Sequence, residues 1–217
     1  MKVHKVDPHS PDRDAIREAA DAIRRGELVV FPTETVYGLA ADALNEAAVK
    51  RVFDAKGRAE RHPLPVQVVG VEQLEQVASE VPDAAKVLAE WFWPGPLTIV
   101  LPRDPSVPDI VTGGRDTIGV RVPEHIVALA LLREIGGPII ATSANLSGRS
   151  APRSAECAIS EVGSKVSVVL DAGESEIGVA STVVDVSVVP PRILRRGAID
   201  AEELRAVLGE VDECDGE

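Results

Sequence analysis

Short apolar runs alternate with amphipathic stretches along almost the whole chain of 217 residues. The apolar runs, most of them followed by Pro, Gly or a polar cluster, predict buried strands. They cover 28–31, 64–69, 97–101, 118–122, 138–141, 166–170, 182–188 and 192–194. Stretches with apolar residues three and four positions apart predict helices at 11–25, 45–54, 82–93, 126–135, 155–162 and 201–208.

The first predicted helix illustrates the signals used. Ile16, Ala19 and Ile23 share one face, Ser10 is the expected N-cap and Gly26 ends the helix. Strands and helices are interspersed throughout, with no long linker and no internal repeat. We therefore expect an α/β protein of the mixed α+β type, with a single domain around one open, twisted, mixed sheet flanked by helices. Two long loops, 102–116 and 143–153, are expected to carry function, because compact domains rarely keep such loops without one.

Composition restricts the class of protein. Hydrophobic residues make up 45% and charged residues 27%, which is typical of a globular chain. The net charge of −12 argues against sequence-blind nucleic-acid binding over the whole surface. No apolar run approaches the ~20 residues of a membrane helix, and the N-terminus lacks an apolar signal region. Cys157 and Cys214 form neither a metal-binding spacing nor a disulfide framework, so we predict a cytoplasmic protein that does not enter a membrane.

The strand predicted at 28–31 ends at Pro32 and is followed by Thr33, Glu34 and Thr35. Short hydroxyl side chains at the end of a strand, close to a glycine at position 38, suit a pocket for a small polar molecule. The alternative is a hairpin turn made of ordinary turn residues.

A basic segment interrupts the acidic chain. Residues 50–61 hold five basic and two acidic side chains, a local charge of +3. Gly57 is expected to take a left-handed cap conformation that holds Lys56 and Arg58 together on a turn. Such a pair suits a polyphosphate, because a guanidinium grips two oxygens and an ammonium acts as a point charge. On charge alone, a solvated helix end that complements the helix dipole fits as well.

Three further positions indicate anion binding. The run 141–148 follows a strand with small and hydroxyl residues, whose amides and hydroxyls suit a phosphate or carboxylate; a Ser/Asn-rich turn is the alternative. Arg121 lies in an apolar strand and needs a partner, either in a structural ion pair or as an anion anchor. Arg195 raises the same question at the end of another strand.

Several common catalytic motifs are absent from the sequence. It contains no Gly-x-x-x-x-Gly-Lys-Ser/Thr loop, no dinucleotide glycine fingerprint and no Gly-x-Ser-x-Gly elbow, and its four histidines have no metal-binding spacing. An enzyme with this sequence is expected to work by positioning and electrostatics rather than through a covalent nucleophile.

Seven motifs, in order along the chain, resemble those of the YrdC-like family of threonylcarbamoyl-adenylate synthases. They are Phe31–Leu39, Lys56-Gly57-Arg58 with Pro63-Leu64, Trp93–Thr98, Val120–Pro123, Ser143–Asn145, Ser181–Val183 and Leu194–Gly197. The resemblance implies a YrdC/RibB-like domain over 10–208 with a concave basic groove, followed by an acidic tail at 209–217. It corresponds to the short form, without the additional C-terminal domain of some members.

The resemblance also implies an activity. Members of the family join L-threonine, bicarbonate or CO2, and ATP into threonylcarbamoyl-AMP and release pyrophosphate, as nucleotidyltransferases. The implied cofactor is Mg²⁺ bound through ATP rather than by protein side chains, with no organic cofactor. The implied partner is the transferase complex that modifies an adenosine beside the tRNA anticodon, with tRNA itself as a further candidate.

Positions that match the family motifs give the implied site residues. Those implied to bind threonine are Thr35, Gln67, Arg121, Ala141 and Ser181. Those implied to bind ATP are Arg58, His62, Thr117, Ser143, Asn145, Ala151 and Arg195. The implied catalytic residues are Lys56 and Arg58. The chain departs from some members at Gln67, where they carry His, and at His62, where they carry Asn.

Two other functions compete with this one. A non-catalytic module for double-stranded RNA or tRNA would use the same groove, and the charge of −12 counts against it. A paralogue would make another acyl- or carbamoyl-adenylate from a different substrate.

Overall fold

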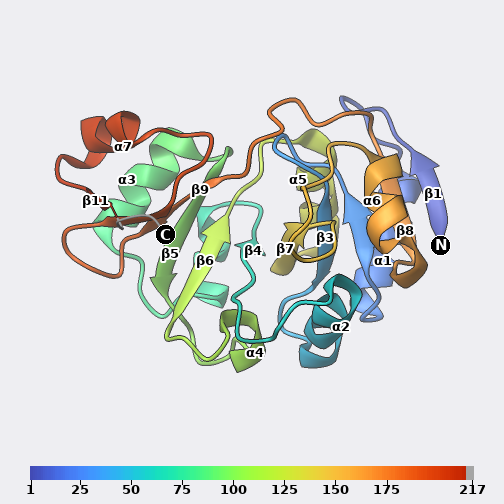
Figure 1. The fold of residues 1–217 in the computed structure, drawn as a ribbon, viewed down its shortest axis with the longest axis horizontal. Coiled ribbons are helices and arrows are strands. Elements are labelled where there is room, and N and C mark those ends of the chain that lie inside the picture. The colour runs from blue at the N-terminus through green and yellow to red at the C-terminus, as the bar shows by residue number, and fades with distance from the viewer. Residues whose placement is uncertain (214–217) are drawn as a thin grey trace.

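One mixed sheet runs through the molecule (Figure 1). The computed structural model describes residues 1–213, and within these residues eleven strands form the sheet in the order β1-β8-β2-β3-β7-β4-β6-β5-β9-β10-β11. The strands are β1 (Lys2–Lys5), β2 (Val29–Phe31), β3 (Gly38–Asp42), β4 (Val66–Gln67), β5 (Leu97–Pro102), β6 (Thr117–Arg121), β7 (Ile139–Ser143), β8 (Val168–Asp171), β9 (Thr182–Asp185), β10 (Arg192–Arg195) and β11 (Asp212–Glu213).

Helices cover both faces of this sheet. They are α1 (Arg13–Arg24), α2 (Glu46–Lys56), α3 (Asp83–Phe92), α4 (Asp109–Thr112), α5 (Ile126–Ile135), α6 (Ala155–Val162) and α7 (Ala201–Leu208), with 3₁₀ turns η1 (Val71–Gln76) and η2 (Gly163–Lys165). The mixed α/β architecture predicted from the sequence is confirmed. No helix in the described part of the chain combines the length and apolar character needed to cross a membrane.

Two apolar layers, one on each face of the sheet, form the core. Successive residues of β2 alternate between them: Val30 belongs to one layer, Val29 and Phe31 to the other. Helices α1 and α5 complete the layer around Phe31, and α2, α3, α6 and α7 contribute to the opposite layer. The predicted inner face of the first helix is confirmed, since Ile16, Ala19 and Ile23 are buried.

The N-cap of α1 differs from the prediction. Asp12, not Ser10, caps the helix, and its Oδ1 accepts a hydrogen bond from the Ala15 amide at 2.9 Å. Asp12 precedes the first helical residue, so its carboxylate reaches the third amide of the helix. Ser10 precedes Pro11 and lies two residues before the N-cap position, too far from the first turn to cap it.

The sheet extends beyond the predicted domain limits of 10 and 208. At one edge β1 pairs in parallel with β8, and at the other β11 pairs in parallel with β10. These strands lie at opposite ends of the molecule (Figure 1). Val211 is buried, so the first residues of the predicted acidic tail belong to the domain. The remainder of that tail, 214–217 with Cys214, lies outside the described residues.

Sheet pairing brings the distant sequence motifs together. Strand β3 pairs antiparallel with β7, which places Gly38 opposite Ser143. Strand β4 lies between β7 and β6, with Gln67 opposite Arg121. Strand β9 pairs in parallel with β5, starting from Thr182 opposite Leu97. The turn before β3, the end of β7, the end of β6 and the residue before β9 therefore meet over neighbouring strands.

Candidate active site

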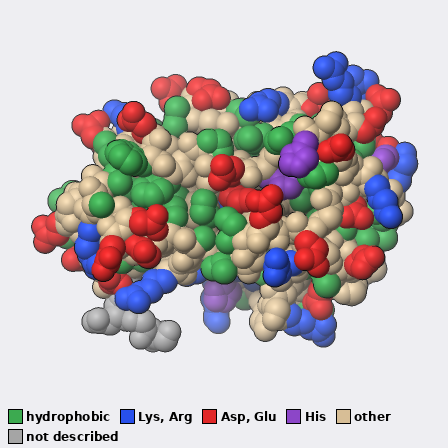
Figure 2. All heavy atoms as spheres, turned by 90° about the horizontal axis from the view of Figure 1, so that it is seen from above, with side chains coloured by type: hydrophobic (Ala, Val, Ile, Leu, Met, Phe, Trp, Pro, Cys, Tyr) green, Lys and Arg blue, Asp and Glu red, His purple; other side chains and the backbone are tan. Residues whose placement is uncertain are grey.

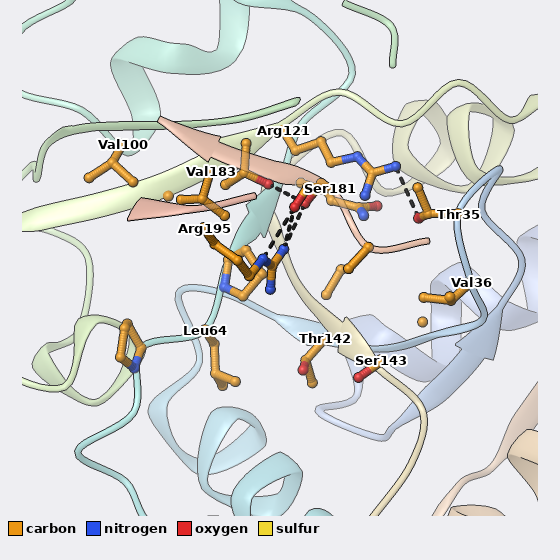
Figure 3. Close-up of a pocket in the computed structure, with 18 of the residues that line it drawn as sticks. Thr35, Val36, Leu64, Val100, Arg121, Thr142, Ser143, Ser181, Val183 and Arg195 are labelled. Atoms are coloured by element: carbon orange, nitrogen blue, oxygen red, sulfur yellow. Dashed lines mark hydrogen bonds between the residues drawn. The ribbon is translucent and has the colours of Figure 1, made fainter. Parts of the chain in front are cut away.

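A cavity of about 390 Å³ lies where these motifs meet (Figure 3). All five residues predicted to bind threonine line it: Thr35, Gln67, Arg121, Ala141 and Ser181. Five of the seven residues predicted to face ATP also line it: Arg58, Thr117, Ser143, Ala151 and Arg195. The fold thus brings side chains from distant parts of the chain together in one cavity.

Arg121 anchors one wall of the cavity. Its Nη2 donates to Glu34 Oε1 at 2.5 Å and to Thr35 Oγ1 at 3.1 Å, and its Nε donates to the Gly95 carbonyl at 3.0 Å. Both charged side chains are buried, with 8% of Arg121 and 5% of Glu34 exposed. Among the described residues no hydrogen bond uses Nη1 of Arg121. The structural ion pair considered for this arginine is therefore present, and because Arg121 also lines the cavity its role as an anion anchor stays a prediction.

The turn that carries Thr35 is held from two sides. Within the turn, Thr33 Oγ1 donates to the Val36 carbonyl at 2.7 Å and lies 2.9 Å from Thr35 Oγ1. Outside it, a segment at 175–178 binds the turn's backbone: Ser175 Oγ donates to Thr33 O, and the amides of residues 177 and 178 donate to the carbonyls of residues 34 and 35, all at 2.9 Å. These bonds fix the hydroxyls before any ligand arrives.

Ser181 and Arg195 form the opposite wall. Ser181 Oγ lies 2.9 Å from Thr98 Oγ1, and Arg195 Nη2 donates to Ser181 Oγ at 3.0 Å and to its carbonyl at 2.7 Å. Gly197 makes this wall possible, because a Cβ there would stand 2.4 Å from backbone atoms of residues 180–182. Any larger residue at 197 would displace Ser181.

Three of the arginines that line this cavity, Arg58, Arg121 and Arg195, are predicted site residues. The pKa of Arg195 is lowered, first by burial of its guanidinium and then by the charges of Arg121 and Arg58. Burial also lowers the pKa of Arg58, whose buried Nε has no hydrogen-bond partner among the described residues. On the face of the molecule seen in Figure 2, in contrast, acidic side chains are spread over the whole surface. The cavity is therefore a concentrated cationic site in an acidic protein, suited to a polyanion.

A family model described as telomere recombination, Sua5_yciO_yrdC, matches residues 21–197. The chain belongs to the Sua5/YciO/YrdC family. It is 50% identical over 196 residues to a threonylcarbamoyl-AMP synthase of Pyrococcus abyssi, and 43% identical over 210 residues to one of Bacillus subtilis. These alignments cover 90% and 96% of this chain but 58% and 61% of the relatives. The chain thus spans about three fifths of their lengths.

The fold agrees with that membership. A crystal structure of P. abyssi Sua5 complexed with L-threonine superposes with a TM-score of 0.96 at 47% identity. The superposition covers 99% of this chain and 63% of that one. The predicted family resemblance is confirmed.

Two features of the family motif Lys56-Gly57-Arg58 follow from its backbone. Gly57 caps α2 in the left-handed conformation, with φ 58° and ψ 38°, as predicted. The cap reverses the chain, so that Arg58 turns into the cavity while Lys56 stays inside the protein. Arg58 Nη2 donates to the Pro63 carbonyl at 3.2 Å, which keeps the guanidinium beside the cavity.

Lys56 has a different environment from the one predicted for it. Only 2% of it is exposed, and it does not line the cavity. Its Nζ donates to the carbonyls of Ser143 and Asn145, the second at 2.7 Å. Burial, and then the charge of Arg58, lower the pKa of Lys56 to about 8. Direct contact of this ammonium with a ligand stays a prediction.

Two of the predicted nucleotide-facing residues also lie outside the cavity lining. His62 is exposed on the turn after Arg58. Asn145 is a buried residue of the loop 143–149. Its Nδ2 donates to the carbonyls of Leu146 and Arg149 in the same loop. The turn directs His62 outward, and the two carbonyls hold Asn145 inward.

The cavity uses residues that the sequence prediction did not assign. Glu34 pairs with Arg121, Thr98 supports Ser181, and Arg115 adds a further cation to the lining. Glu34 and Thr98 lie within the family motifs, and this position is the sequence feature that could have identified them as site residues. Ser175 lies in no motif, and nothing in the sequence indicated its bond to Thr33.

A buried acceptor also faces this space. Gln67 lines the cavity, is 5% exposed, and its Oε1 has no hydrogen-bond partner among the described residues. A buried amide oxygen without a donor is costly, and a ligand N–H or O–H would satisfy it. The cavity therefore offers one free acceptor close to several cationic donors.

Proposed function

We propose that this protein is a nucleotidyltransferase that makes threonylcarbamoyl-AMP from L-threonine, bicarbonate or CO2, and ATP, and releases pyrophosphate. The observation that carries the proposal is the convergence of Arg58, Arg121 and Arg195 with the hydroxyls of Thr35 and Ser181 in one cavity. A zwitterionic amino acid and a triphosphate together need this combination of cations, hydroxyls and a free acceptor. The names of the relatives and the threonine bound to P. abyssi Sua5 support it.

The proposed chemistry has two steps. The neutral amine of threonine attacks CO2: an N–C bond forms while one C–O π bond breaks and its electron pair goes to oxygen, and the nitrogen loses a proton to water, which gives a carbamate. A carbamate oxygen then attacks the α-phosphorus of ATP, forming one O–P bond while the bond to the β-phosphate oxygen breaks. Pyrophosphate carries away the electron pair. Positioning and neutralisation of charge are the main demands on the protein in such a transfer.

The protein's residues divide between these demands. Arg121, Thr35 and Ser181 would hold the amino acid, with its carboxylate at the free nitrogen of Arg121. Arg58 and Arg195 would neutralise the triphosphate. The α-phosphorus would lie between the two groups, because they share one cavity of about 390 Å³.

Magnesium belongs to the proposal as the ion bound with ATP. In residues 1–213 no three His, Cys, Asp or Glu side chains lie close enough together to hold a metal ion, so the phosphate oxygens would be its main ligands. When bound, the ion neutralises phosphate charge. The product would pass to a transferase complex that modifies tRNA, and the cytoplasmic location stays a prediction.

The deciding experiment measures pyrophosphate release with threonine, with serine and with no amino acid. We expect release to require both threonine and bicarbonate, and serine to react roughly 10-fold to 200-fold more slowly, the range for one missing methyl group in a pocket. Release that is independent of an amino acid refutes the proposal, and faster release with another acid identifies a paralogue. Salt-sensitive tRNA binding without any release identifies the RNA-binding module instead.

The pKa of Lys56 gives a prediction about pH. Affinity for a non-hydrolysable ATP analogue should fall as pH rises above about 8, because the ammonium that adds positive charge behind Ser143 is then lost. Calorimetry between pH 7.5 and 9.5 measures this without the amine of threonine, which titrates in the same range. The variant Lys56→Arg keeps its charge and should bind with a flat profile; a flat profile in the unchanged protein contradicts the prediction.

Protein stability should respond in the opposite direction. The pKa of Lys56 is about 8 in the folded protein and 10.5 as the ordinary value, so the unfolded chain binds more protons between these pH values. The contribution of Lys56 to the free energy of unfolding therefore increases as pH rises from about 8 towards 10.5.

A further inference from the structure

The loop Ser143–Arg149 begins at the end of β7 and leads towards α6, and its first residue, Ser143, lines the cavity (Figure 3). Its residues from 147 onward are exposed, so packing alone does not hold it. The loop nevertheless has a dense set of hydrogen bonds to two other parts of the protein.

The first part is the end of α2, beneath the loop. Lys56 Nζ donates to the carbonyls of Ser143 and Asn145, and the Ser147 amide donates to the Lys56 carbonyl at 2.9 Å. These three bonds tie the loop to the residue that precedes Gly57 and Arg58. The loop that begins at Ser143 and the turn that carries Arg58 are thereby joined.

The second part is Glu161, on the last turn of α6. Its Oε2 accepts a hydrogen bond from the Leu146 amide at 3.1 Å, and its Oε1 accepts one from Arg149 Nη1 at 2.9 Å. Only 18% of the Glu161 side chain is exposed. Hydrogen bonding from Arg149 and from the Leu146 amide lowers the pKa of Glu161, so its carboxylate stays charged at neutral pH.

Asn145 connects these contacts to the site. Its Nδ2 donates to the carbonyls of Leu146 and Arg149 at 2.9 and 2.8 Å, the two residues that Glu161 binds. Its Oδ1 is buried and has no partner among the described residues. The orientation of this amide therefore depends on where Glu161 places the loop backbone.

We propose that Glu161 is a positioning residue that fixes the loop Ser143–Arg149 in the conformation that binds the triphosphate. The inference rests on the proposed function, in that the loop faces the nucleotide. Glu161 itself touches no substrate. It acts through the Leu146 amide and through Asn145, in addition to the bonds that Lys56 makes to the same loop.

The test compares Glu161→Ala and Glu161→Gln with a control on the same helix, Glu156→Ala. Glu156 is exposed and lies in the first turn of α6, so it reports any general effect of removing a carboxylate from that helix. The measurements are the affinity for a non-hydrolysable ATP analogue by calorimetry, and separate KM values for ATP and threonine.

Glu161→Ala should weaken analogue binding and raise KM for ATP by roughly 10-fold to 100-fold, the scale of a lost hydrogen bond to a charged group. Glu161→Gln keeps an oxygen for the Leu146 amide but loses the charge that pairs with Arg149, so it should bind the analogue more tightly than Glu161→Ala and roughly twofold to fivefold more weakly than the control. KM for threonine should change by less than about twofold in both variants, and Glu156→Ala should match the unchanged protein.

The proposal is overturned if Glu161→Ala, folded by circular dichroism, binds the analogue like the control, or if KM for threonine rises as much as KM for ATP. Should Glu161→Ala not fold, Glu161→Gln provides the same comparison, because weaker analogue binding than in the control supports the proposal and equal binding overturns it. If the unchanged protein binds the analogue but releases no pyrophosphate, the proposed function fails while the calorimetry still decides the role of Glu161. An unchanged protein that does not bind the analogue overturns both.

Discussion

Replacing Arg58 by alanine should lower kcat/KM for ATP by roughly 10²-fold to 10³-fold, the cost of removing one preorganised electrostatic contact from a transition state. Arg58 lies at the cavity, its buried Nε has no hydrogen-bond partner within residues 1–213, and burial disfavours its charge unless an anion is present. A triphosphate supplies that anion, and its charge shifts towards the leaving pyrophosphate as the reaction proceeds. Pyrophosphate release at several ATP concentrations measures the change.

Two variants make the Arg58 prediction specific. Arg61→Ala removes an arginine from the same basic segment, but Arg61 is exposed and does not line the cavity, so its rate should stay near that of the unchanged protein. Arg58→Lys keeps the charge and loses the two-pronged geometry, so its rate should fall between the two. A near-normal kcat/KM in Arg58→Ala would show that the phosphate contacts are assigned to the wrong residue.

The elements best predicted from sequence are those with local signals. The bounds of α5 and α6 match the periodic stretches 126–135 and 155–162, and Gly57 takes the left-handed cap expected of it. Strand β3 was missed, because Leu39, Ala40 and Ala41 include no β-branched residue and are buried on both faces of the sheet. Helix α4 was missed within the predicted loop 102–116, because its single turn is too short to show a period.

For the site, the sequence predicts which residues line the cavity better than it predicts which residues contact them. The family motifs identify most of the cavity lining, since each motif is a short stretch that can be matched by itself. What surrounds a side chain depends on residues far along the chain. Lys56 meets carbonyls 87 and 89 positions away, and Thr33 is bound by Ser175, 142 positions away. Neither composition nor motif spacing indicates hydrogen bonds between residues so far apart in the sequence, so the burial of Lys56 could not be predicted.

Glu34→Ala should cause the largest loss of stability of any single change at the site. It leaves the Arg121 guanidinium buried without its counter-charge, and breaking a buried ion pair from one side costs about 3–5 kcal/mol in the free energy of unfolding. Chemical denaturation measures the loss. Asp21→Ala provides the control, because the Arg24–Asp21 pair is 2.8 Å long but about half exposed on both sides, and exposed pairs contribute little.

A double variant that removes both charges tests whether the loss of stability in Glu34→Ala comes from the unpaired charge of Arg121. The double variant Glu34→Gln with Arg121→Met leaves no uncompensated charge, so it should be more stable than Glu34→Ala although it lacks more native contacts. If Glu34→Ala is no less stable than Asp21→Ala, the ion pair is not a structural element of the fold.

Ligand binding adds a second expectation for Glu34→Ala that concerns the substrate itself. A ligand that binds only the folded protein stabilises it by RT ln(1 + c/Kd), where c is the free ligand concentration, so tighter binding gives more stabilisation at the same ligand concentration. In this variant the carboxylate of threonine would be the nearest replacement for the missing counter-charge of Arg121. Added threonine should therefore raise the melting temperature of Glu34→Ala more than that of the unchanged protein, and threoninol, which carries a CH2OH group in place of the carboxylate, should not. Equal shifts with both compounds would place the amino-acid carboxylate away from Arg121, and the wall formed by Thr35 and Arg121 would then hold another part of the substrate.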